Sequence, residues 1–410
     1  MFVRLLTRLA WMLSFTALLA SCGGGSPAPA PTGLKAAPGE NSATVSWDMV
    51  PGVEYWLFYA PTVLAPADNS NMSRWFSSGG AAVLKVSSPF TVGNLSNDFG
   101  YSFTVNGRTD GGPGGPAPTS VTATPRFAGA TWSTGTTTGT TDLHAVTYGT
   151  QFVAAGMVGA LYSSADGSTW TAANTGTTRN LHGADYYGDY RVVGDGGLLL
   201  SSTDTITWTT RATNTSNHLY ALANNGFSLL VAVGANGTIL SSSDGVTWTP
   251  ATNAGTTKDL FAVTYSSYNN GTWLAVGADG TIVSSTDALT WKVLNADTTA
   301  DLRGITFGYS NTTTLATNFV VVGSGGTVLN SADTTTWTKQ TLPGAKALNA
   351  VRYGNQFIAV GAGGSVFLSK DAATWTAADT AGNTKDLWAV GRGAGSYMAV
   401  GTSGTNLLAK

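Results

Sequence analysis

Residues 241–249 read SSSDGVTWT, and five further segments of the chain repeat this pattern. Each copy has an aspartate, a short turn-like stretch and a Thr-Trp pair, in that order. The aspartates are Asp166, Asp204, Asp244, Asp287, Asp333 and Asp371. Because a single active site does not need six copies of one residue, the pattern belongs to the architecture of the chain.

The repeat unit is about 40 residues long, since the Thr-Trp pairs recur at that interval from Trp132 to Trp375. Each unit starts with a strand that begins Leu-x-Ala or Leu-x-Gly. A strand ending in glycine, a Gly-x-x-Gly turn, a third strand, the aspartate turn and a strand at Thr-Trp follow. Four short strands in about 40 residues predict one blade of a β-propeller.

The two ends of the repeat region give the number of blades. Seven inner strands begin at leucine, and the last unit, 387–410, has only three strands. An unpartnered Thr-Trp strand lies at 129–134, before the first unit. We therefore predict a seven-bladed propeller over 127–410, in which the strand at 129–134 completes the last blade and hides two sheet edges. An open solenoid is the alternative, and it would leave both ends unpaired.

The composition supports an all-β chain and excludes one class of partner. Charged residues make up 10% of the 410 residues, against about 25% in an average soluble domain. Glycine, threonine and asparagine suit strands and tight turns. The net charge is −2 and no basic run occurs, so no nucleic-acid partner is expected.

The N-terminus has the order of a secretory signal. Arg4 and Arg8 precede an apolar stretch that ends in Leu19-Ala20-Ser21-Cys22. These last residues resemble the lipobox of bacterial lipoproteins, in which the cysteine is acylated after cleavage before it. The resemblance implies a signal peptide over 1–22, lipidation of Cys22 and an exported protein anchored in the bacterial cell envelope. Gly23 follows the cysteine, and the family's sorting rule then favours the outer membrane of a diderm bacterium.

Two segments separate the anchor from the propeller. Residues 23–31 (GGGSPAPAP) have the composition of a flexible linker. Residues 32–125 resemble a fibronectin type III domain in the order of ATVSWDMV (43–50), EYWLFYA (54–60), Leu95 and Tyr101. The resemblance implies an immunoglobulin-like sandwich with Trp47 in its core and Tyr101 at a corner. We expect this domain to act as a spacer.

The stretch at 241–249 resembles the Asp-box, in a form one residue shorter. In families that carry this motif the aspartate braces a hairpin and the tryptophan packs between blades, and Ser243, Asp244, Thr247 and Trp248 match its positions. Four copies lack a glycine after the aspartate, so the geometry of their turns is expected to vary. The motif is known from sialidases, which need a tyrosine activated by a glutamate. Sialidase activity is not expected, because the only glutamates, Glu40 and Glu54, precede the propeller.

No cofactor or metal site is expected. Other glycosidases need two close carboxylates, but the aspartates of the propeller recur in the turns or before the inner strands. The acidic stretch DYYGDYRVVGDGG (185–197) raises the possibility of calcium, yet its spacing fits no known calcium loop.

One column of the repeat varies while its neighbours stay constant, namely the residue after the leucine of the inner strand. If the blades are equivalent, these seven side chains lie near one end of the propeller axis. Most are aromatic or imidazole groups, which are typical of recognition surfaces, although packing between blades is the competing interpretation. The residues of this candidate binding rim are His144, His182, Tyr220, Phe261, Arg303, Asn349 and Trp388.

The repeats, as in AVGANGTILSSSDGVTWT (232–249), resemble the photosystem II assembly and stability factor family over roughly 127–410. That family is a non-enzymatic assembly chaperone on a seven-bladed propeller. Our leading hypothesis is a lipid-anchored scaffold that binds a protein partner and is not an enzyme. The alternative is a carbohydrate-binding or carbohydrate-active protein that acts on an envelope glycan, and a weaker one is a purely structural surface protein.

Overall fold

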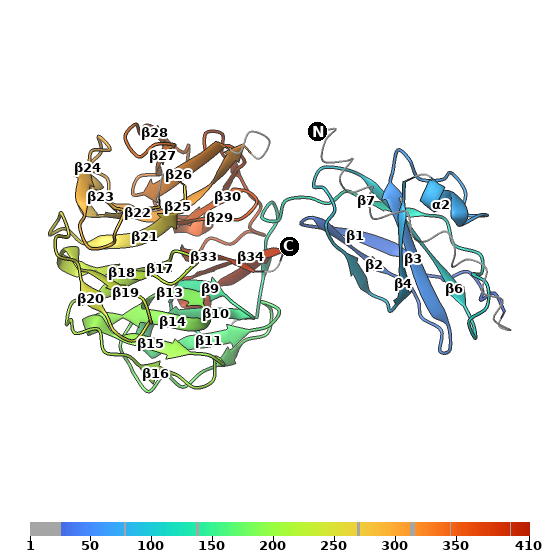
Figure 1. Ribbon diagram of the computed structural model, residues 1–410, viewed down its shortest axis with the longest axis horizontal. Helices are drawn as coiled ribbons and strands as arrows, with labels where there is room; N and C mark the ends of the chain where they lie inside the picture. The colour runs from blue at the N-terminus through green and yellow to red at the C-terminus, as the bar shows by residue number, and fades with distance from the viewer. Residues whose placement is uncertain are drawn as a thin grey trace. The chain divides into compact units, whose positions relative to one another are not determined.

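The computed structural model describes residues 26–410, except 78, 137–138, 269–270, 312–315, 345 and 394. The expected signal peptide, Cys22 and the first part of the linker lie outside the described residues. The chain divides into two compact units, Met1–Phe127 and Ala128–Lys410, and both consist almost entirely of strands (Figure 1). The expectation of an all-β chain is confirmed.

The N-terminal unit contains two sheets that share one core. Trp47, Leu57 and Phe103 are buried in this core, and the hydroxyl of Tyr101 accepts a hydrogen bond of 3.2 Å from the Ser96 N–H. One sheet has the order β1-β2-β5 and the other β4-β3-β6-β7. The strands are β1 (Lys35–Gly39), β2 (Ser42–Ser46), β3 (Glu54–Pro61), β4 (Ala81–Val86), β5 (Phe90–Val92), β6 (Tyr101–Arg108) and β7 (Val121–Ala123).

Two features of this unit differ from the sequence-based expectation. A short helix, α2 (Ser73–Ser77), buries Trp75 against Phe58 in a second small core. Residues assigned to the flexible linker also pack on the unit, because Pro27 pairs with Arg108 and Ala28 is buried. Pro27 and Ala28 of the predicted linker are therefore part of the folded N-terminal unit.

The described part of the C-terminal unit forms seven four-stranded antiparallel sheets, which we number 1 to 7 in chain order. Sheet 1 comprises β9 (Leu143–Tyr148), β10 (Phe152–Gly156), β11 (Leu161–Ser164) and β12 (Thr171–Ala172). Sheet 2 comprises β13 (Leu181–Tyr187), β14 (Asp189–Gly194), β15 (Leu199–Ser202) and β16 (Thr209–Thr210). Sheet 3 comprises β17 (Leu219–Asn224), β18 (Leu230–Gly234), β19 (Ile239–Ser242) and β20 (Thr249–Pro250). Sheets 4 and 5 comprise β21 (Leu260–Ser266), β22 (Thr272–Gly277), β23 (Ile282–Ser285), β24 (Lys292–Leu294); and β25 (Leu302–Asn311), β26 (Ala316–Gly323), β27 (Thr327–Ser331), β28 (Thr338–Thr341). Sheets 6 and 7 comprise β29 (Leu348–Tyr353), β30 (Phe357–Gly361), β31 (Val366–Ser369), β32 (Thr376–Ala377); and β33 (Leu387–Gly393), β34 (Ser396–Gly401), β35 (Asn406–Ala409) with β8 (Ser133–Thr134).

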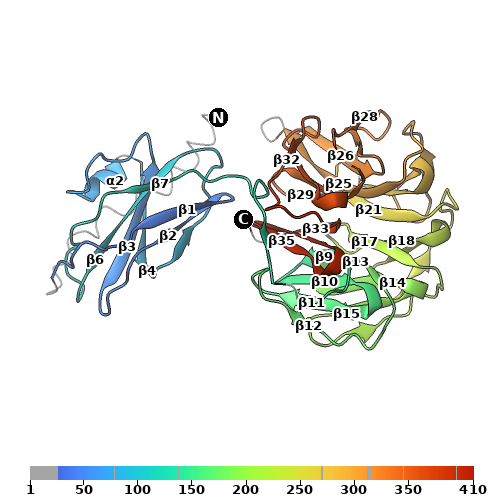
Figure 2. The same cartoon turned by 180° about the vertical axis from the view of Figure 1, so that it is seen from behind.

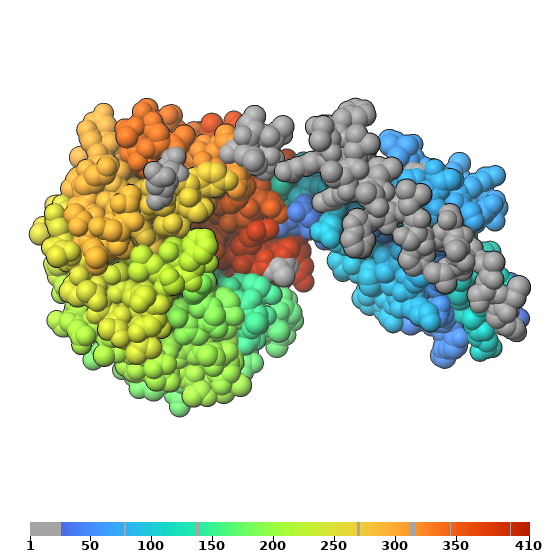
Figure 3. Space-filling view, in the orientation of Figure 1, coloured from blue at the N-terminus to red at the C-terminus, as the bar shows by residue number. Residues whose placement is uncertain are grey.

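The sheets follow one another round an axis. Each first strand contacts the first strand of the next sheet, and β33 of sheet 7 contacts β9 of sheet 1. Figures 1 and 2 show the red strands of sheet 7 beside the green strands of sheet 1, and Figure 3 shows the same junction in the packed surface. Each sheet is open, and β8 is the fourth strand of sheet 7 through its pairing with β35.

Hydrophobic cores lie between consecutive sheets, because each sheet buries both of its faces. The core between sheets 6 and 7 contains Trp132, Val360 and Tyr397, and the core between sheets 7 and 1 contains Met398 and Trp170. Equivalent clusters fill the other five junctions. A tryptophan that follows the aspartate turn packs into these cores, as expected from the Thr-Trp repeat.

The Gly-x-x-Gly segments connect the second and third strands as tight turns. In sheet 4 a Cβ on Gly277 would overlap the carbonyl oxygen of Asp259, and Gly280 has a φ of +71°. Close backbone approach and a left-handed conformation therefore select glycine at these two positions. The segments are tight turns between strands, as the repeat pattern predicts.

Candidate functional site

The seven residues of the candidate rim occupy one structural position. In each sheet the buried leucine that begins the inner strand pairs with the glycine that ends the second strand, and the register then shifts so that the next residue is left unpaired. Such a β-bulge bends the strand and re-aims one side chain. The bulge recurs because Leu-x-Ala/Gly recurs, and it presents the variable residue at the same end of each inner strand.

These side chains contact one another from sheet to sheet. The ring centroids of Trp388 and His144 are 5.5 Å apart, and those of His144 and His182 are 5.9 Å apart. Tyr220 lies 5.5 Å from His182 and 5.7 Å from Phe261. Five aromatic or imidazole rings thus form a continuous arc over sheets 7, 1, 2, 3 and 4.

Arg303 and Asn349 form the remaining part of this ring of side chains. An Arg303 Nη1–H donates to Asn349 Oδ1 at 2.9 Å, and Asn349 Nδ2 donates to the Leu387 carbonyl at 2.9 Å. Asn349 is 7% exposed, whereas the other six residues are half-buried. We call the seven residues the axial ring, and its described contacts leave two junctions, Phe261 to Arg303 and Asn349 to Trp388, without a hydrogen bond or ring contact between the side chains.

All three histidines of the chain lie at this site, although only two belong to the predicted rim. Asp195 Oδ1 is 2.7 Å from His182 Nε2 and 2.9 Å from His218 Nδ1, and Tyr220 packs against both imidazoles. Burial tends to raise the pKa of Asp195, but the hydrogen bond and charge of His182 hold it below the usual value. The repeat pattern contained no signal for His218 or Asp195, since neither occupies the variable column.

The surroundings of His144 lower the pKa of its imidazole. Burial lowers the pKa of His144, and the neighbouring His182 lowers it further because two adjacent imidazolium groups repel each other. This imidazole lies between the rings of Trp388 and His182. Only the rings of His144 and His182 are stacked, and the other neighbouring rings of the arc meet at tilted or T-shaped angles.

A second repeated contact joins the sheets at this end of the strands. The residue before the inner-strand leucine accepts a backbone N–H from the Gly-x-x-Gly turn of the preceding sheet. Asp259 accepts from Asn236 at 2.8 Å, and Asp142 accepts from Ser403 at 2.8 Å, which joins sheet 7 to sheet 1. The other such acceptors are Asn180, His218, Asp301 and Asp386.

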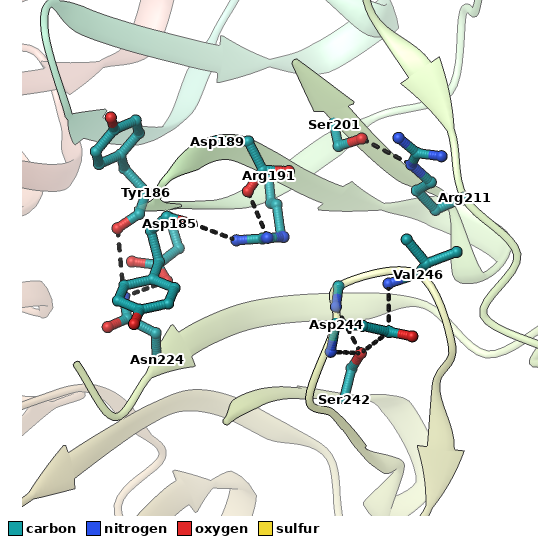
Figure 4. Close-up of polar contacts among 12 residues, drawn as sticks. Asp185, Tyr186, Asp189, Arg191, Ser201, Arg211, Asn224, Ser242, Asp244 and Val246 are labelled. Carbon is teal, nitrogen blue, oxygen red and sulfur yellow. Dashed lines mark hydrogen bonds and ion pairs between the residues drawn. The ribbon is translucent and has the colours of Figure 1, made fainter. Parts of the chain in front are cut away.

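The six repeated aspartates lie in the turns between the third and fourth strands. Asp244 Oδ1 accepts a hydrogen bond from the Val246 N–H at 2.8 Å (Figure 4), and it accepts a second one from the Thr247 N–H at 2.7 Å. The other five aspartates make the same pair of bonds at 2.7–2.9 Å. These N–H donors lower the pKa of Asp244 to about 2.

Two details of these turns correct the expectation. The serine that bonds to Asp244 is Ser242 and not Ser243: its hydroxyl donates to Asp244 Oδ1 at 3.0 Å and accepts the Gly245 N–H at 2.8 Å. The turns without glycine also keep the same geometry. The residue after the aspartate has a φ between 61° and 74° in all six copies, whether it is Gly167, Thr205, Gly245, Ala288, Thr334 or Ala372.

A buried arginine lies beside the turn of Asp244. Arg191 pairs with Asp189 and donates from Nη1 to the Tyr187 carbonyl (Figure 4). A Cβ on Gly245 would lie 2.6 Å from its Nη2. In the other sheets the residues at the position of Arg191, such as Val231 and Val320, are apolar. Sheet 2 has a buried arginine there, and Asp189 of the acidic stretch 185–197 is its ion-pair partner.

Among the described residues, no group of three or more His, Cys, Asp or Glu side chains is arranged to hold a metal ion. Within this described part of the chain, none of the helices has the length and apolar character needed to span a membrane.

No family model and no curated protein matches the sequence. Solved structures do match the fold of the C-terminal unit. The chain is similar to YCF48 bound to a D1 peptide, with a TM-score of 0.55, 15% identity and coverage of 68% of this chain and 94% of that one. It is also similar to YCF48 from Cyanidioschyzon merolae, with a TM-score of 0.54, 16% identity and coverage of 68% and 98%.

Two further solved structures are similar to this chain in fold. The WD40 β-propeller domain of Doa1 has a TM-score of 0.55 at 10% identity, with coverage of 69% of this chain and 97% of that one. A catalytically inactive virginiamycin B lyase from Staphylococcus aureus has a TM-score of 0.58 at 10% identity, with coverage of 68% and 98%. Identities this low carry the fold alone, and they support a β-propeller in the C-terminal part of the chain.

Proposed function

We propose that this chain is a non-enzymatic scaffold of the bacterial cell envelope that binds a protein segment on the axial ring of its propeller. The observation that carries the proposal is the ring itself. Seven bulges aim variable, mostly aromatic side chains at one end of the inner strands, whereas the residues on either side of them repeat. Large side chains with few rotatable bonds are typical of protein-recognition surfaces.

The proposed architecture has two folded domains. Seven sheets with cores at every junction, and β8 as the outer strand of sheet 7, support a seven-bladed propeller closed by an N-terminal strand. The two sheets of the N-terminal unit and the bond to the Tyr101 hydroxyl support a fibronectin type III-like sandwich over 32–125. We assign the six turn aspartates a structural role, because each accepts the backbone N–H bonds of its own turn.

The localisation part of the proposal rests on the sequence. A signal peptide over 1–22 and acylation of Cys22 would anchor the chain by lipid in the envelope, at the outer membrane under the sorting rule for glycine after the cysteine. Mass spectrometry of the chain isolated from its native membrane tests this, since an acylated N-terminal cysteine is expected. A mature chain that begins elsewhere would overturn the anchor.

Two features favour a protein partner over a glycan. Three of the five aromatic or imidazole rings, those of His144, His182 and Tyr220, are wedged between two neighbouring rings of the arc, so little flat area is left for a sugar to stack on. YCF48, which has a similar fold, has been solved with a D1 peptide. A glycan ligand is therefore the second candidate, and the same experiment tests it.

The experiment compares the purified full chain on a peptide array and on an envelope-glycan array. We expect peptide capture, and we expect the double variant Phe261→Ala and Trp388→Ala to weaken it by at least about tenfold, as for central aromatic contacts elsewhere. The control is Ile206→Ala with Phe227→Ala. These side chains are 76% and 70% exposed in turns at the opposite end of the strands, so capture is expected to stay unchanged.

Thermal melting of each variant separates binding from folding. Loss of capture with an unchanged melting temperature supports the ring as the site. Capture of glycans alone would favour the carbohydrate alternative, and equal peptide capture by both double variants would exclude the ring.

A further inference from the structure

Arg303 carries the one guanidinium of the axial ring, and it is held in place by its neighbour. Asn349 accepts one hydrogen bond from the guanidinium, and its own amide is fixed by the carbonyl of Leu387. Because Asn349 is nearly fully buried, it has little freedom to turn away. The guanidinium is therefore preorganised at the end of the aromatic arc.

Arg303 has no acidic partner among the described residues. The basic side chains that form ion pairs among the described residues are Arg74, Lys85, His182, Arg191, His218 and Lys258. The nearest aspartate in the sequence, Asp301, accepts the backbone N–H of Asp279 instead. A guanidinium has five N–H donors in a planar fork, and Asn349 accepts from only one nitrogen of that fork.

We propose that Arg303 binds a carboxylate of the captured protein segment and that Asn349 is its positioning residue. This inference rests on the proposed function of the axial ring. A carboxylate accepts two parallel N–H bonds from an arginine, and such bonds are stronger when water is partly excluded. No described hydrogen bond or ring contact joins Arg303 to Phe261, and the N–H groups that Asn349 does not use are the donors that we assign to the carboxylate.

The ring favours a carboxylate over a phosphate group. Recognition of phosphorylated motifs uses clusters of arginines, whereas the axial ring has a single guanidinium. The carboxylate has two possible sources in a protein segment: the C-terminus of a chain, or an Asp or Glu side chain. Both present the same planar group to Arg303.

The test uses four libraries of eight-residue peptides in solution with the full-length chain. Two libraries end in a free carboxylate and two in an amide, and one of each pair excludes Asp and Glu. We expect the wild-type chain to retain carboxylate-bearing peptides at least about tenfold more strongly than the neutral, amidated library. Retention of the free-acid library that excludes Asp and Glu points to a C-terminus, and retention of the amidated library that contains them points to a side chain.

Three variants locate the effect. Arg303→Gln is expected to abolish the preference while neutral peptides still bind. Asn349→Asp is expected to do the same, because it places a carboxylate on Arg303 within the protein. Lys258→Gln removes an exposed cation next to sheet 4 that is paired with Asp279, and its preference is expected to equal that of the wild type.

The possible failures are distinguishable. If neutral and acidic peptides bind equally well, the carboxylate site is wrong and the proposed function stands. If Arg303→Gln keeps the preference, another group reads the carboxylate and the assignment is wrong. If Asn349→Asp keeps it at an unchanged melting temperature, Asn349 has no positioning role, and if no library is retained, both proposals fall.

Discussion

Thr334 has a backbone conformation that glycine has in two other aspartate turns. Its φ is 67°, and those of Gly167 and Gly245 are 74° and 70°. The left-handed region costs a residue with a Cβ about 1–2 kcal/mol, and threonine is β-branched. The N–H of Thr334 and its carbonyl bond to Ser331 and Trp337, so the turn keeps its bonds if the side chain is removed.

We expect Thr334→Gly to stabilise the chain by about 0.5–1 kcal/mol, because the strain relieved exceeds the extra entropy of glycine in the unfolded state. Urea denaturation monitored by tryptophan fluorescence measures the change. Thr335→Gly is the matched control, since Thr335 is not among the positive-φ residues, and it is expected to destabilise by about 0.5–1 kcal/mol. Destabilisation by both changes would show that Thr334 is not strained.

At the scale of single residues, the sequence located the axial ring but not its chemistry. The variable column identified seven positions because the residues around them repeat. It could not show that Asn349 fixes Arg303, or that Asp195 lies between His182 and His218. Asn349 and His218 come from the sheet that follows the one of their partner, and Asp195 lies in a turn of the same sheet as His182. All of these contacts depend on side-chain directions that the repeat does not encode.

At the scale of structural elements, the hydrogen bonds of the aspartate turns make the stability of the chain depend on pH in the acidic range. The backbone N–H groups of Thr247 and Val246 lower the pKa of Asp244 to about 2, and Asp333 has the same value for the same reason. The folded-state pKa lies below the unfolded value of 3.8. The stabilisation is therefore complete above about pH 4 and is lost as the pH falls from about 4 to about 2.

We expect Asp244→Asn to lower the melting temperature at pH 7, because a neutral amide oxygen is a weaker acceptor than a carboxylate. The difference from the wild type is expected to shrink between about pH 4 and about pH 2, where the wild-type carboxylate becomes protonated. Calorimetry at neutral pH and at both ends of this window measures it. Ser243→Ala, an exposed change in the same turn, is expected to have no effect, and a pH-independent difference for Asp244→Asn would contradict the assignment.

The order of the elements was predicted better than their detail. Turn residues and Thr-Trp pairs placed the strands to within a residue or two, since the strands of sheets 1 to 6 are neighbouring segments, and the unpartnered Thr-Trp segment located β8 of sheet 7. The bulge at each axial-ring residue and the helix around Trp75 were not predicted. A bulge depends on register against the next strand, and this short helix has no apolar periodicity.

On the scale of the whole molecule, the C-terminal unit depends on residues from its two ends. Trp132 is 3% exposed and packs between sheets 6 and 7. Its Nε1–H donates to the Gly129 carbonyl at 2.7 Å, and Gln356 of sheet 6 donates to the Ala128 carbonyl at 2.8 Å. The segment before the first repeat is thus built into the last two sheets.

We expect Trp132→Ala to destabilise the C-terminal unit by about 3–5 kcal/mol, the usual cost of removing a buried aromatic side chain. Hydrogen exchange measured by mass spectrometry is expected to show faster exchange in β35, which pairs with β8. Trp56→Ala in the N-terminal unit is the control and is expected to leave exchange in β35 unchanged. Unaltered exchange in Trp132→Ala would show that the 128–134 segment is not part of the sheet.

The sequence by itself determined the repeated unit, because the turns and strand patterns that define each sheet are local and are written in every copy. Composition likewise determined the all-β class and the low density of charge. Only the tertiary structure decided which side chains of the axial ring meet, which serine supports Asp244, and where Arg191 finds its partner. The contacts of the axial ring join different sheets, and the partners of Asp244 and Arg191 depend on the side-chain geometry within one turn and one hairpin. All of them follow from the three-dimensional arrangement and not from the period of the chain.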